Sequence, residues 1–103
     1  MQPKELHKLI KASKAPVILD VRSAMEFRAG HIPGAERVSF WKVLFRLAKL
    51  PAEKDTRIVV LCESGARAEM VLSMLAKRGY SRLELLDGDM AGWRNAGFPM
   101  QKA

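Results

Sequence analysis

The chain has a single cysteine among its 103 residues, and this scarcity excludes several kinds of protein. One cysteine allows no intramolecular disulfide, no CxxC redox pair and no cysteine-rich zinc site. The two histidines, His7 and His31, lie far apart in the sequence and form no ligand motif, so we predict no metal site and no cofactor. If Cys62 has a chemical role, it acts alone as a nucleophile or a carrier.

Long hydrophobic runs are also missing. No apolar stretch approaches the roughly 20 residues that cross a bilayer, and residues 1–14 lack the apolar centre of a secretory signal. We therefore expect a soluble cytoplasmic protein with no membrane partner. With 49% apolar and 28% charged residues, the chain is long enough for one hydrophobic core, and we expect residues 1–103 to form a single domain.

Acidic residues are outnumbered, with 18 Lys and Arg against 11 Asp and Glu and a net charge of +7. The basic residues are scattered along the chain and do not form the stripe of cations and exposed aromatics that is typical of nucleic-acid binding. We therefore expect no nucleic-acid partner. A basic surface can still attract a small anionic substrate or an acidic partner protein.

Apolar periodicity divides the chain into alternating helical and extended segments. Short β-branched runs predict strands over 15–21, 56–62 and 81–88, with a brief extended piece at 36–39. Helices are predicted over 3–12, 23–30, 40–50, 66–79 and 89–97. Because strands alternate with helices, we expect an α/β fold with a mostly parallel sheet covered by helices on both faces.

Local signals set several helix ends. Ser23 is a good N-cap with Glu26 three residues later, and Gly79 is placed to stop the helix over 66–79. The helix over 66–79 has an apolar stripe of Ala68, Val71, Leu72 and Leu75. Pro51 ends the helix over 40–50, whose single apolar face is made of Phe40, Trp41, Leu44, Phe45 and Leu47.

Three chemically useful side chains stand at the carboxyl ends of the predicted strands: Asp20, Cys62 and Asp87. In parallel α/β sheets, ligands bind beyond this edge. We therefore expect Cys62 at the floor of a pocket, in the loop that joins a buried strand to a helix.

The loop sequence CESGAR, residues 62–67, suits a reactive thiolate. Backbone N–H groups and the helix dipole at such a junction stabilise negative charge on sulfur. Gly65 lets the loop curl round the sulfur, Arg67 supplies a cation for an anionic substrate, and Ser64 can cap the helix. The same residues also fit a plainer interpretation, with Cys62 a small buried apolar side chain and Arg67 a surface residue.

Three stretches of the chain resemble the single-domain rhodaneses, which are sulfurtransferases. The first, LDVRSAMEFRAGHIPGA over 19–35, is similar to the family's D-V-R-x-x-x-E-(F/Y)-x-x-G-H-I-P-G-A signature. The second is the Cys62-x-x-Gly65-x-Arg67 loop. The third, LLDGDMAGWRNAGFP over 85–99, is close to the family's closing L-x-G-G-x-x-x-W-x-x-x-G-x-P. The resemblance implies a rhodanese-like sheet of four to five strands.

Two residues depart from the family's pattern. Asp89 stands where the family usually has a second glycine, which predicts an altered turn beside the pocket. Glu63 places a negative charge next to the cysteine, and this weakens the case for thiosulfate as the donor. The family's usual first strand is also missing or very short before Pro3, which favours four strands over five.

The resemblance implies that Cys62 takes a sulfane sulfur from a donor such as thiosulfate, holds it as a persulfide, and passes it to cyanide or another thiophilic acceptor. It implies that the loop of Glu63, Ser64, Gly65, Ala66 and Arg67 binds the persulfide. We expect Asp20 and Arg22 to brace the pocket.

Other residues in the matching stretches receive structural interpretations. We interpret Glu26 as structural, and we expect His31 to bond backbone near the Pro33-Gly34 turn. Trp93 is expected in the core, while Phe40 and Trp41 either line the pocket mouth or pack as helix residues.

Two alternatives remain. A carrier or docking module in a sulfur relay would accept sulfur from a partner protein's persulfide. A Cys-dependent phosphatase or arsenate reductase is disfavoured, because such enzymes generally use a C-x5-R loop and only four residues separate Cys62 from Arg67.

Overall fold

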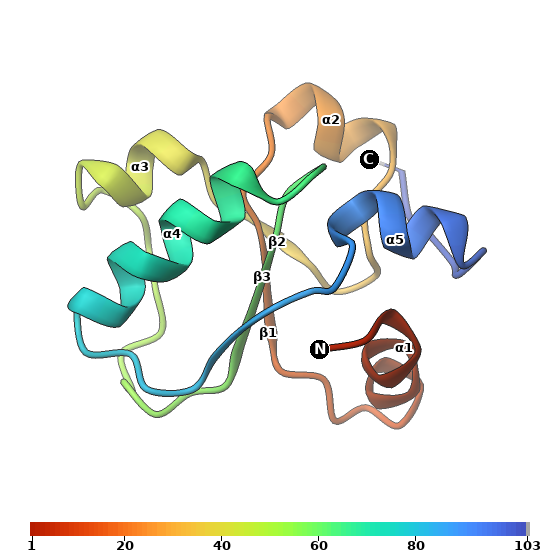
Figure 1. The fold of residues 1–103 in the computed structure, drawn as a ribbon, viewed down its shortest axis with the longest axis horizontal. Coiled ribbons are helices and arrows are strands. Elements are labelled where there is room, and N and C mark those ends of the chain that lie inside the picture. The colour runs from red at the N-terminus through yellow and green to blue at the C-terminus, as the bar shows by residue number, and fades with distance from the viewer. Residues whose placement is uncertain (103) are drawn as a thin grey trace.

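The computed structural model describes residues 1–102, in which a four-stranded sheet runs through the middle of the molecule (Figure 1). The strands are β1 (Val17–Asp20), β2 (Glu36–Arg37), β3 (Ile58–Leu61) and β4 (Leu83–Leu85). The helices are α1 (Pro3–Lys11), α2 (Ala24–Ala29), α3 (Phe40–Leu44), α4 (Ala66–Lys77) and α5 (Asp89–Asn95). These elements follow the order predicted from the sequence.

The sheet has the strand order β2-β1-β3-β4, and every neighbouring pair is parallel. All four residues of β3, Ile58 to Leu61, are fully buried, as expected for a central parallel strand made of β-branched and aliphatic residues. The α/β fold class with a mostly parallel sheet is therefore confirmed, with four strands among residues 1–102.

Alternate side chains of the strands enter two separate cores, one on each face of the sheet. Val60 packs with Val71 and Leu75 of α4 and with Val43 of α3. On the opposite face, Leu61 and its neighbours pack with residues of α1 and α5: Leu6, Met90 and Trp93. Figure 1 shows this division, with α3 and α4 on one side of the strands and α1 and α5 on the other. Trp93 is fully buried, which confirms its prediction as a core residue.

The sequence signals at the ends of α2 and α4 are confirmed. The Ser23 side chain accepts a hydrogen bond from the amide of Glu26, whose carboxylate accepts one from the amide of Ser23, so the pair forms a capping box. Gly79 follows α4 with a φ of 96°, the left-handed conformation expected of a glycine after a helix. None of the helices within residues 1–102 has the length and apolar character needed to cross a membrane.

The prediction of a helix over the whole of 40–50 is wrong. Helix α3 ends at Leu44, and Arg46 adopts a left-handed φ of 60° that breaks the helical path. Only Val43 of α3 is buried, whereas the apolar face predicted from the spacing is largely in solvent. The exposed fractions are 63% for Trp41, 43% for Leu44, 66% for Phe45 and 74% for Leu47.

Candidate functional site

Cys62 lies directly after β3, and three loop residues separate it from the first residue of α4. Its Sγ accepts a hydrogen bond from the backbone N–H of Gly65, with an N···S distance of 3.0 Å. The loop therefore turns back on the sulfur just before the helix begins, where unpaired N–H groups and the helix dipole favour negative charge. Of the loop amides predicted to face the sulfur, that of Gly65 contacts it.

Gly65 is required by the shape of this turn. Its φ of +110° lies in the region that side chains rarely adopt, and a Cβ there would lie 3.0 Å from Oδ2 of Asp89. Gly65 is also the N-cap of α4, with no side-chain cap. The prediction that Ser64 caps this helix is therefore wrong, because the chain begins α4 one residue later and Ser64 is exposed.

The start of α5 holds the backbone of Cys62 from both sides. The amide of Met90 donates to the carbonyl oxygen of Cys62 at 2.9 Å, and Oδ1 of Asp89 accepts from the amide of Cys62 at 3.1 Å. Burial raises the pKa of the Asp89 carboxyl. Asp89 also has a left-handed φ of 53°, so it occupies a turn conformation that a glycine would adopt without strain.

Asp20 and Arg22 form a buried ion pair at the end of β1. Nε and a terminal nitrogen of Arg22 donate to the two carboxylate oxygens of Asp20 at 2.9 and 2.8 Å. The terminal nitrogen also donates to the carbonyl oxygen of Gly30 at 2.8 Å. Burial alone would lower the pKa of Arg22, but the hydrogen bonds and charge of Asp20 raise it. The pair joins β1 to the end of α2.

Glu63 extends this network to the surface. Its carboxylate lies 3.3 Å from Nη1 of Arg22 and 2.9 Å from Nη1 of Arg94. The hydrogen bond from Arg94, followed by the attraction of both cations, lowers the pKa of Glu63. The residue beside the cysteine is therefore an ionised carboxylate held between two guanidinium groups.

Arg67, in the first turn of α4, pairs with Glu26 of α2. Its two terminal nitrogens donate to the Glu26 carboxylate at 2.9 and 3.2 Å. This interaction lowers the pKa of Glu26 to about 2. The hydrogen bonds and charge of Glu26 in turn raise the pKa of Arg67. Arg67 is therefore not a free cation, because its ion pair with Glu26 links α4 to α2.

Beside this network, a pocket of about 510 Å³ opens between α2, α3 and α4. Arg22 and Arg67 line it together with Phe40, Trp41 and Met70. The interpretation of Phe40 and Trp41 as residues of the pocket mouth therefore agrees with the geometry. The prediction that Cys62 lies at the floor of a pocket is wrong, because Cys62 is only 1% exposed and does not line this pocket.

Two other side chains differ from expectation. Nδ1 of His31 lies 2.9 Å from the carbonyl oxygen of Phe27, and the two rings stack, so His31 bonds backbone of α2 and not the turn that follows it. Asp87 lies at the predicted sheet edge, but its carboxylate pairs with the amino terminus at 3.7 Å. Among residues 1–102, no group of three or more His, Cys, Asp or Glu side chains is arranged to hold a metal ion.

Sequence reasoning missed the partners of several charged residues near Cys62. The sequence pattern gives no indication that Arg94 pairs with Glu63, or that Arg67 is the partner of Glu26. Asp89 was noticed because it replaces a glycine, and that substitution was the available signal for its contact with the Cys62 amide. The ion pairs of Glu63 and Glu26 join residues 31 and 41 positions apart, a separation that leaves no local pattern.

The sequence pattern of the rhodanese-like domain family matches residues 2–96, nearly the whole chain. The chain belongs to this family. The matched residues include the Cys62 loop, the Asp20–Arg22 pair and both segments that hold them, α2 and α5.

Individual proteins are also similar to this chain in sequence or in structure. A protein named sulfurtransferase from Allochromatium vinosum is 30% identical over 84 residues, which cover 82% of this chain and 77% of that protein. A protein named thiosulfate sulfurtransferase GlpE from Pseudoalteromonas translucida is 32% identical over 81 residues, with 78% and 74% coverage. The crystal structure of the Alr3790 protein from Anabaena sp. matches with a TM-score of 0.89 at 25% identity, covering 100% of this chain and 82% of that one.

Proposed function

We propose that this rhodanese-like domain is a sulfurtransferase that carries sulfur as a persulfide on Cys62. The observation that carries the proposal is the contact between Cys62 Sγ and the amide of Gly65, 3.0 Å apart, at the start of α4. Amides in this position stabilise an anionic sulfur without a general base. The names of the two sulfurtransferase relatives support the same chemistry.

The reaction has two steps. The Cys62 thiolate attacks the outer sulfur of thiosulfate, a new S–S bond forms on Cys62, and the broken S–S bond releases sulfite with its electron pair. Cyanide, or another thiophile, then attacks the terminal sulfur of the persulfide, which forms thiocyanate and returns the Cys62 thiolate. Neither step needs an oxidant, a reductant or a metal ion.

The surrounding residues position the sulfur in this scheme. Met90 and Asp89 fix the two ends of the Cys62 peptide unit, while Asp20 and Arg22 hold the neighbouring end of β1 rigid. Loop amides from Glu63 to Arg67 would face the terminal sulfur of the persulfide, with the Gly65 amide already in contact with Sγ. Arg67 would stabilise the transferred group as it arrives from the pocket.

The charges around Cys62 also influence which sulfur donor the site can accept. Arg67 is already paired with Glu26, and the carboxylate of Glu63 lies between Arg22 and Arg94. A dianion such as thiosulfate must therefore compete with Glu26 for Arg67 and approach an existing negative charge. A persulfide donor, with less charge, meets less repulsion. This observation favours a relay role, in which the domain accepts sulfur from another persulfide, as the second candidate function.

The proposal is tested by comparing donors on wild type and Cys62→Ser. We expect transfer from thiosulfate to cyanide and from cysteine persulfide to cyanide, and we expect Cys62→Ser to abolish both while its circular dichroism spectrum stays that of the folded protein. Ser73→Ala, an exposed change on α4, is the matched control and should keep full activity. A higher kcat/KM for cysteine persulfide than for thiosulfate would favour the relay role.

An aryl phosphate is the negative-control substrate, tested with the same protein. We expect no hydrolysis, because the four-residue spacing between Cys62 and Arg67 is short for a phosphate-binding loop. Substantial transfer by Cys62→Ser, or phosphate release that exceeds sulfur transfer in wild type, would overturn the proposed function.

A further inference from the structure

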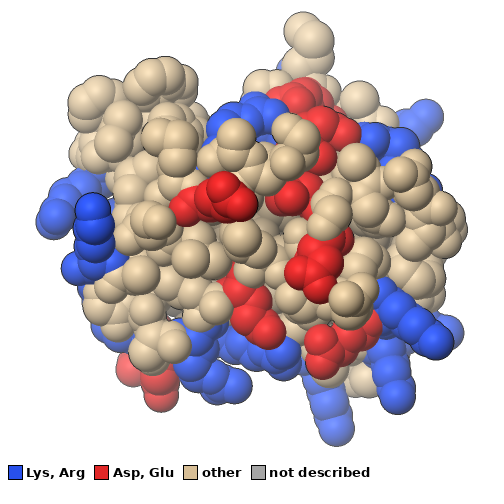
Figure 2. Space-filling model, viewed as in Figure 1, with Lys and Arg blue, Asp and Glu red and all other residues tan. Residues whose placement is uncertain are grey.

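The segment that follows β2 exposes apolar side chains beside the candidate site. Trp41 and Phe45 are 63% and 66% exposed, and their rings stack with centroids 6.4 Å apart. Figure 2 shows a largely uncharged area over α3, at the upper left of the view, while the Asp and Glu of this face gather nearer its middle. Contiguous exposed apolar surface of this kind marks binding sites more often than chance. We call this surface, residues 37–50, the α3 surface.

The charges of the α3 surface have one sign. Between Arg37 and Leu50 the sequence contains four cations and no Asp or Glu. Arg37, Lys42, Arg46 and Lys49 are all exposed, and none of them forms an ion pair with another residue of the described chain. The arginines beside Cys62 (Arg22, Arg67 and Arg94) are paired, so these four cations are the unpaired ones next to the candidate site.

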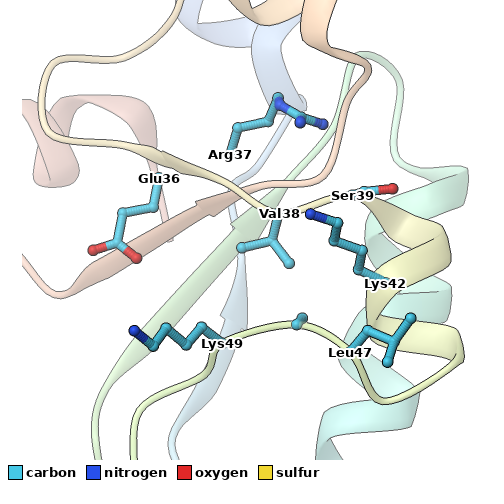
Figure 3. Close-up of a pocket in the computed structure, with 8 residues that line it drawn as sticks. Glu36, Arg37, Val38, Ser39, Lys42, Leu47 and Lys49 are labelled. Atoms are coloured by element: carbon cyan, nitrogen blue, oxygen red, sulfur yellow. The ribbon is translucent and has the colours of Figure 1, made fainter.

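Two adjoining pockets connect the α3 surface to the candidate site. One, of about 360 Å³, is lined by Glu36, Arg37, Ser39, Lys42 and Lys49, so it contains one carboxylate beside three cations (Figure 3). The second is the pocket of about 510 Å³ whose walls include Arg22 and Arg67. Arg37 and Ser39 belong to both, so the two pockets adjoin, and the second reaches Arg22 and Arg67 of the candidate site.

We propose that the α3 surface docks an acidic partner protein that presents a persulfide to Cys62. The inference rests on the proposed sulfur transfer and names the class of its donor. Acidic side chains of the partner would pair with Lys42, Arg46 and Lys49, and an apolar side chain would pack on Trp41 and Phe45. The partner's sulfur would enter the pocket that Arg67 borders.

The two adjoining pockets favour a protein over the other anionic surfaces that a basic, aromatic segment could bind. A membrane or a nucleic acid would cover the α3 surface without delivering anything to the pocket beside Cys62. An acidic protein would pair with the cations, cover the apolar side chains and supply a sulfur atom to the pocket that Arg67 lines. Buried aromatic anchors ringed by complementary charges are the usual composition of such interfaces.

The step at the docked site is balanced. The Cys62 thiolate attacks the outer sulfur of the partner's persulfide and forms the Cys62 persulfide. The partner's S–S bond breaks, its electron pair stays on the partner's cysteine sulfur, and that thiolate takes a proton from water.

The test uses two synthetic peptide persulfides and one small donor. Both peptides carry a leucine near the cysteine; one has flanking glutamates and the other flanking lysines, and free cysteine persulfide is the small donor. The rate of sulfur loading on Cys62 is measured by intact mass at low salt. We expect the acidic peptide to load wild type about tenfold faster than the lysine peptide, and we expect added salt to reduce this ratio.

Two matched triple variants test which cations cause the preference for the acidic peptide. Lys42→Gln/Arg46→Gln/Lys49→Gln and Lys4→Gln/Lys8→Gln/Lys11→Gln each remove three cations, the first on the α3 surface and the second on α1, across the sheet. We expect only the first to abolish the preference for the acidic peptide. Phe45→Ala should slow the acidic peptide about tenfold and leave free cysteine persulfide unchanged.

Each other outcome overturns the inference in a recognisable way. Equal loading rates for the two peptides, or an equal loss of the acidic-peptide preference in the two triple variants, would show that the α3 surface is not the docking site. Binding of anionic phospholipid vesicles that depends on Lys42, Arg46 and Lys49, with no preference for the acidic peptide, would assign the surface to a membrane. If free cysteine persulfide also fails to load Cys62, the proposed function itself fails.

Discussion

The Cys62 loop and the α3 surface are neighbours with opposite construction. Around Cys62, the charged side chains form ion pairs, and the backbone of the cysteine is bonded on both sides. On the α3 surface, four cations and several apolar side chains face solvent without partners in the described chain. The contacts of the first region fix the position of the Cys62 sulfur. The exposed groups of the second region are available to contact a partner.

This difference separates the two tasks that a group-transfer domain performs. Catalysis at sulfur requires donors fixed in advance, because a network that must reorganise loses part of its stabilisation of the reacting charge. Recognition of a partner instead uses exposed apolar and charged groups that gain energy only when they are covered. Substitutions in the two regions should therefore differ sharply in their effect on stability.

The largest effect is expected at the buried ion pair. Arg22→Met leaves Asp20 fully buried without its cation, and this should reduce the free energy of unfolding by about 3–5 kcal/mol. Adding Asp20→Asn should restore much of the loss, because neither charge then remains uncompensated. Urea unfolding followed by circular dichroism measures both variants. A loss below about 1 kcal/mol for Arg22→Met would show that the site is less rigid than the contacts indicate.

The two tryptophans compare the core with the α3 surface directly. Trp93 is fully buried and its Nε1 donates to the carbonyl oxygen of Pro99 at 2.9 Å, so Trp93→Ala should cost about 3–5 kcal/mol. Trp41 is 63% exposed, so Trp41→Ala should change stability by no more than about 0.5 kcal/mol. Chemical denaturation of the two variants gives the comparison, and similar losses would mean that Trp41 belongs to the core.

An intermediate effect is expected at Gly65. Gly65→Ala should destabilise by about 1–3 kcal/mol, because φ is +110° and the new Cβ meets Asp89 Oδ2. It should also reduce sulfur transfer, since the amide that contacts Sγ is displaced. Gly34→Ala is the control: its φ is +86°, and nothing lies within 4 Å of the added Cβ. We expect Gly34→Ala to lose stability with full activity; equal activity losses would contradict the role of the Gly65 amide.

The smallest effect is expected at the half-exposed pair of Glu26 and Arg67. The folded pKa of Glu26 is about 2, below the ordinary value of 4.5, so the pair stabilises the fold above pH 4.5. That contribution is lost as the pH falls from 4.5 through about 2. Glu26→Gln, which keeps the capping box, should cost about 0.5 kcal/mol at pH 7 and nothing near pH 2. Unfolding curves at several pH values test this, and a pH-independent difference would contradict it.

The sequence was sufficient for the parts of the fold that depend on local pattern. The β-branched run IVVL predicted β3, and Ser23 with Glu26 predicted the start of α2, because both signals lie within one element. The position of Cys62 at the carboxyl edge of the sheet followed from the parallel topology alone. The contact of the Gly65 amide with the sulfur agrees with the loop chemistry expected from CESGAR.

The parts that the sequence did not predict depend on contacts between distant segments. The apolar spacing of 40–50 fits a helix, yet Val43 is the only buried residue of α3. The helix ends at Leu44, and the left-handed φ of Arg46 prevents it from continuing. Phe45 and Leu47 fit the periodic pattern of a buried face but lie in solvent. Periodicity reports which residues share a face, and it does not report whether another element of the same chain covers that face.

The central claim is that Cys62 carries the transferred sulfur, and intact-mass measurement tests it most directly. After incubation with thiosulfate or cysteine persulfide, the protein should gain the mass of one sulfur atom, located on the peptide that contains Cys62, and cyanide should remove it. Cys62→Ser should gain nothing. An unchanged wild-type mass with every donor, or an equal gain in Cys62→Ser, would show that Cys62 does not carry the transferred sulfur.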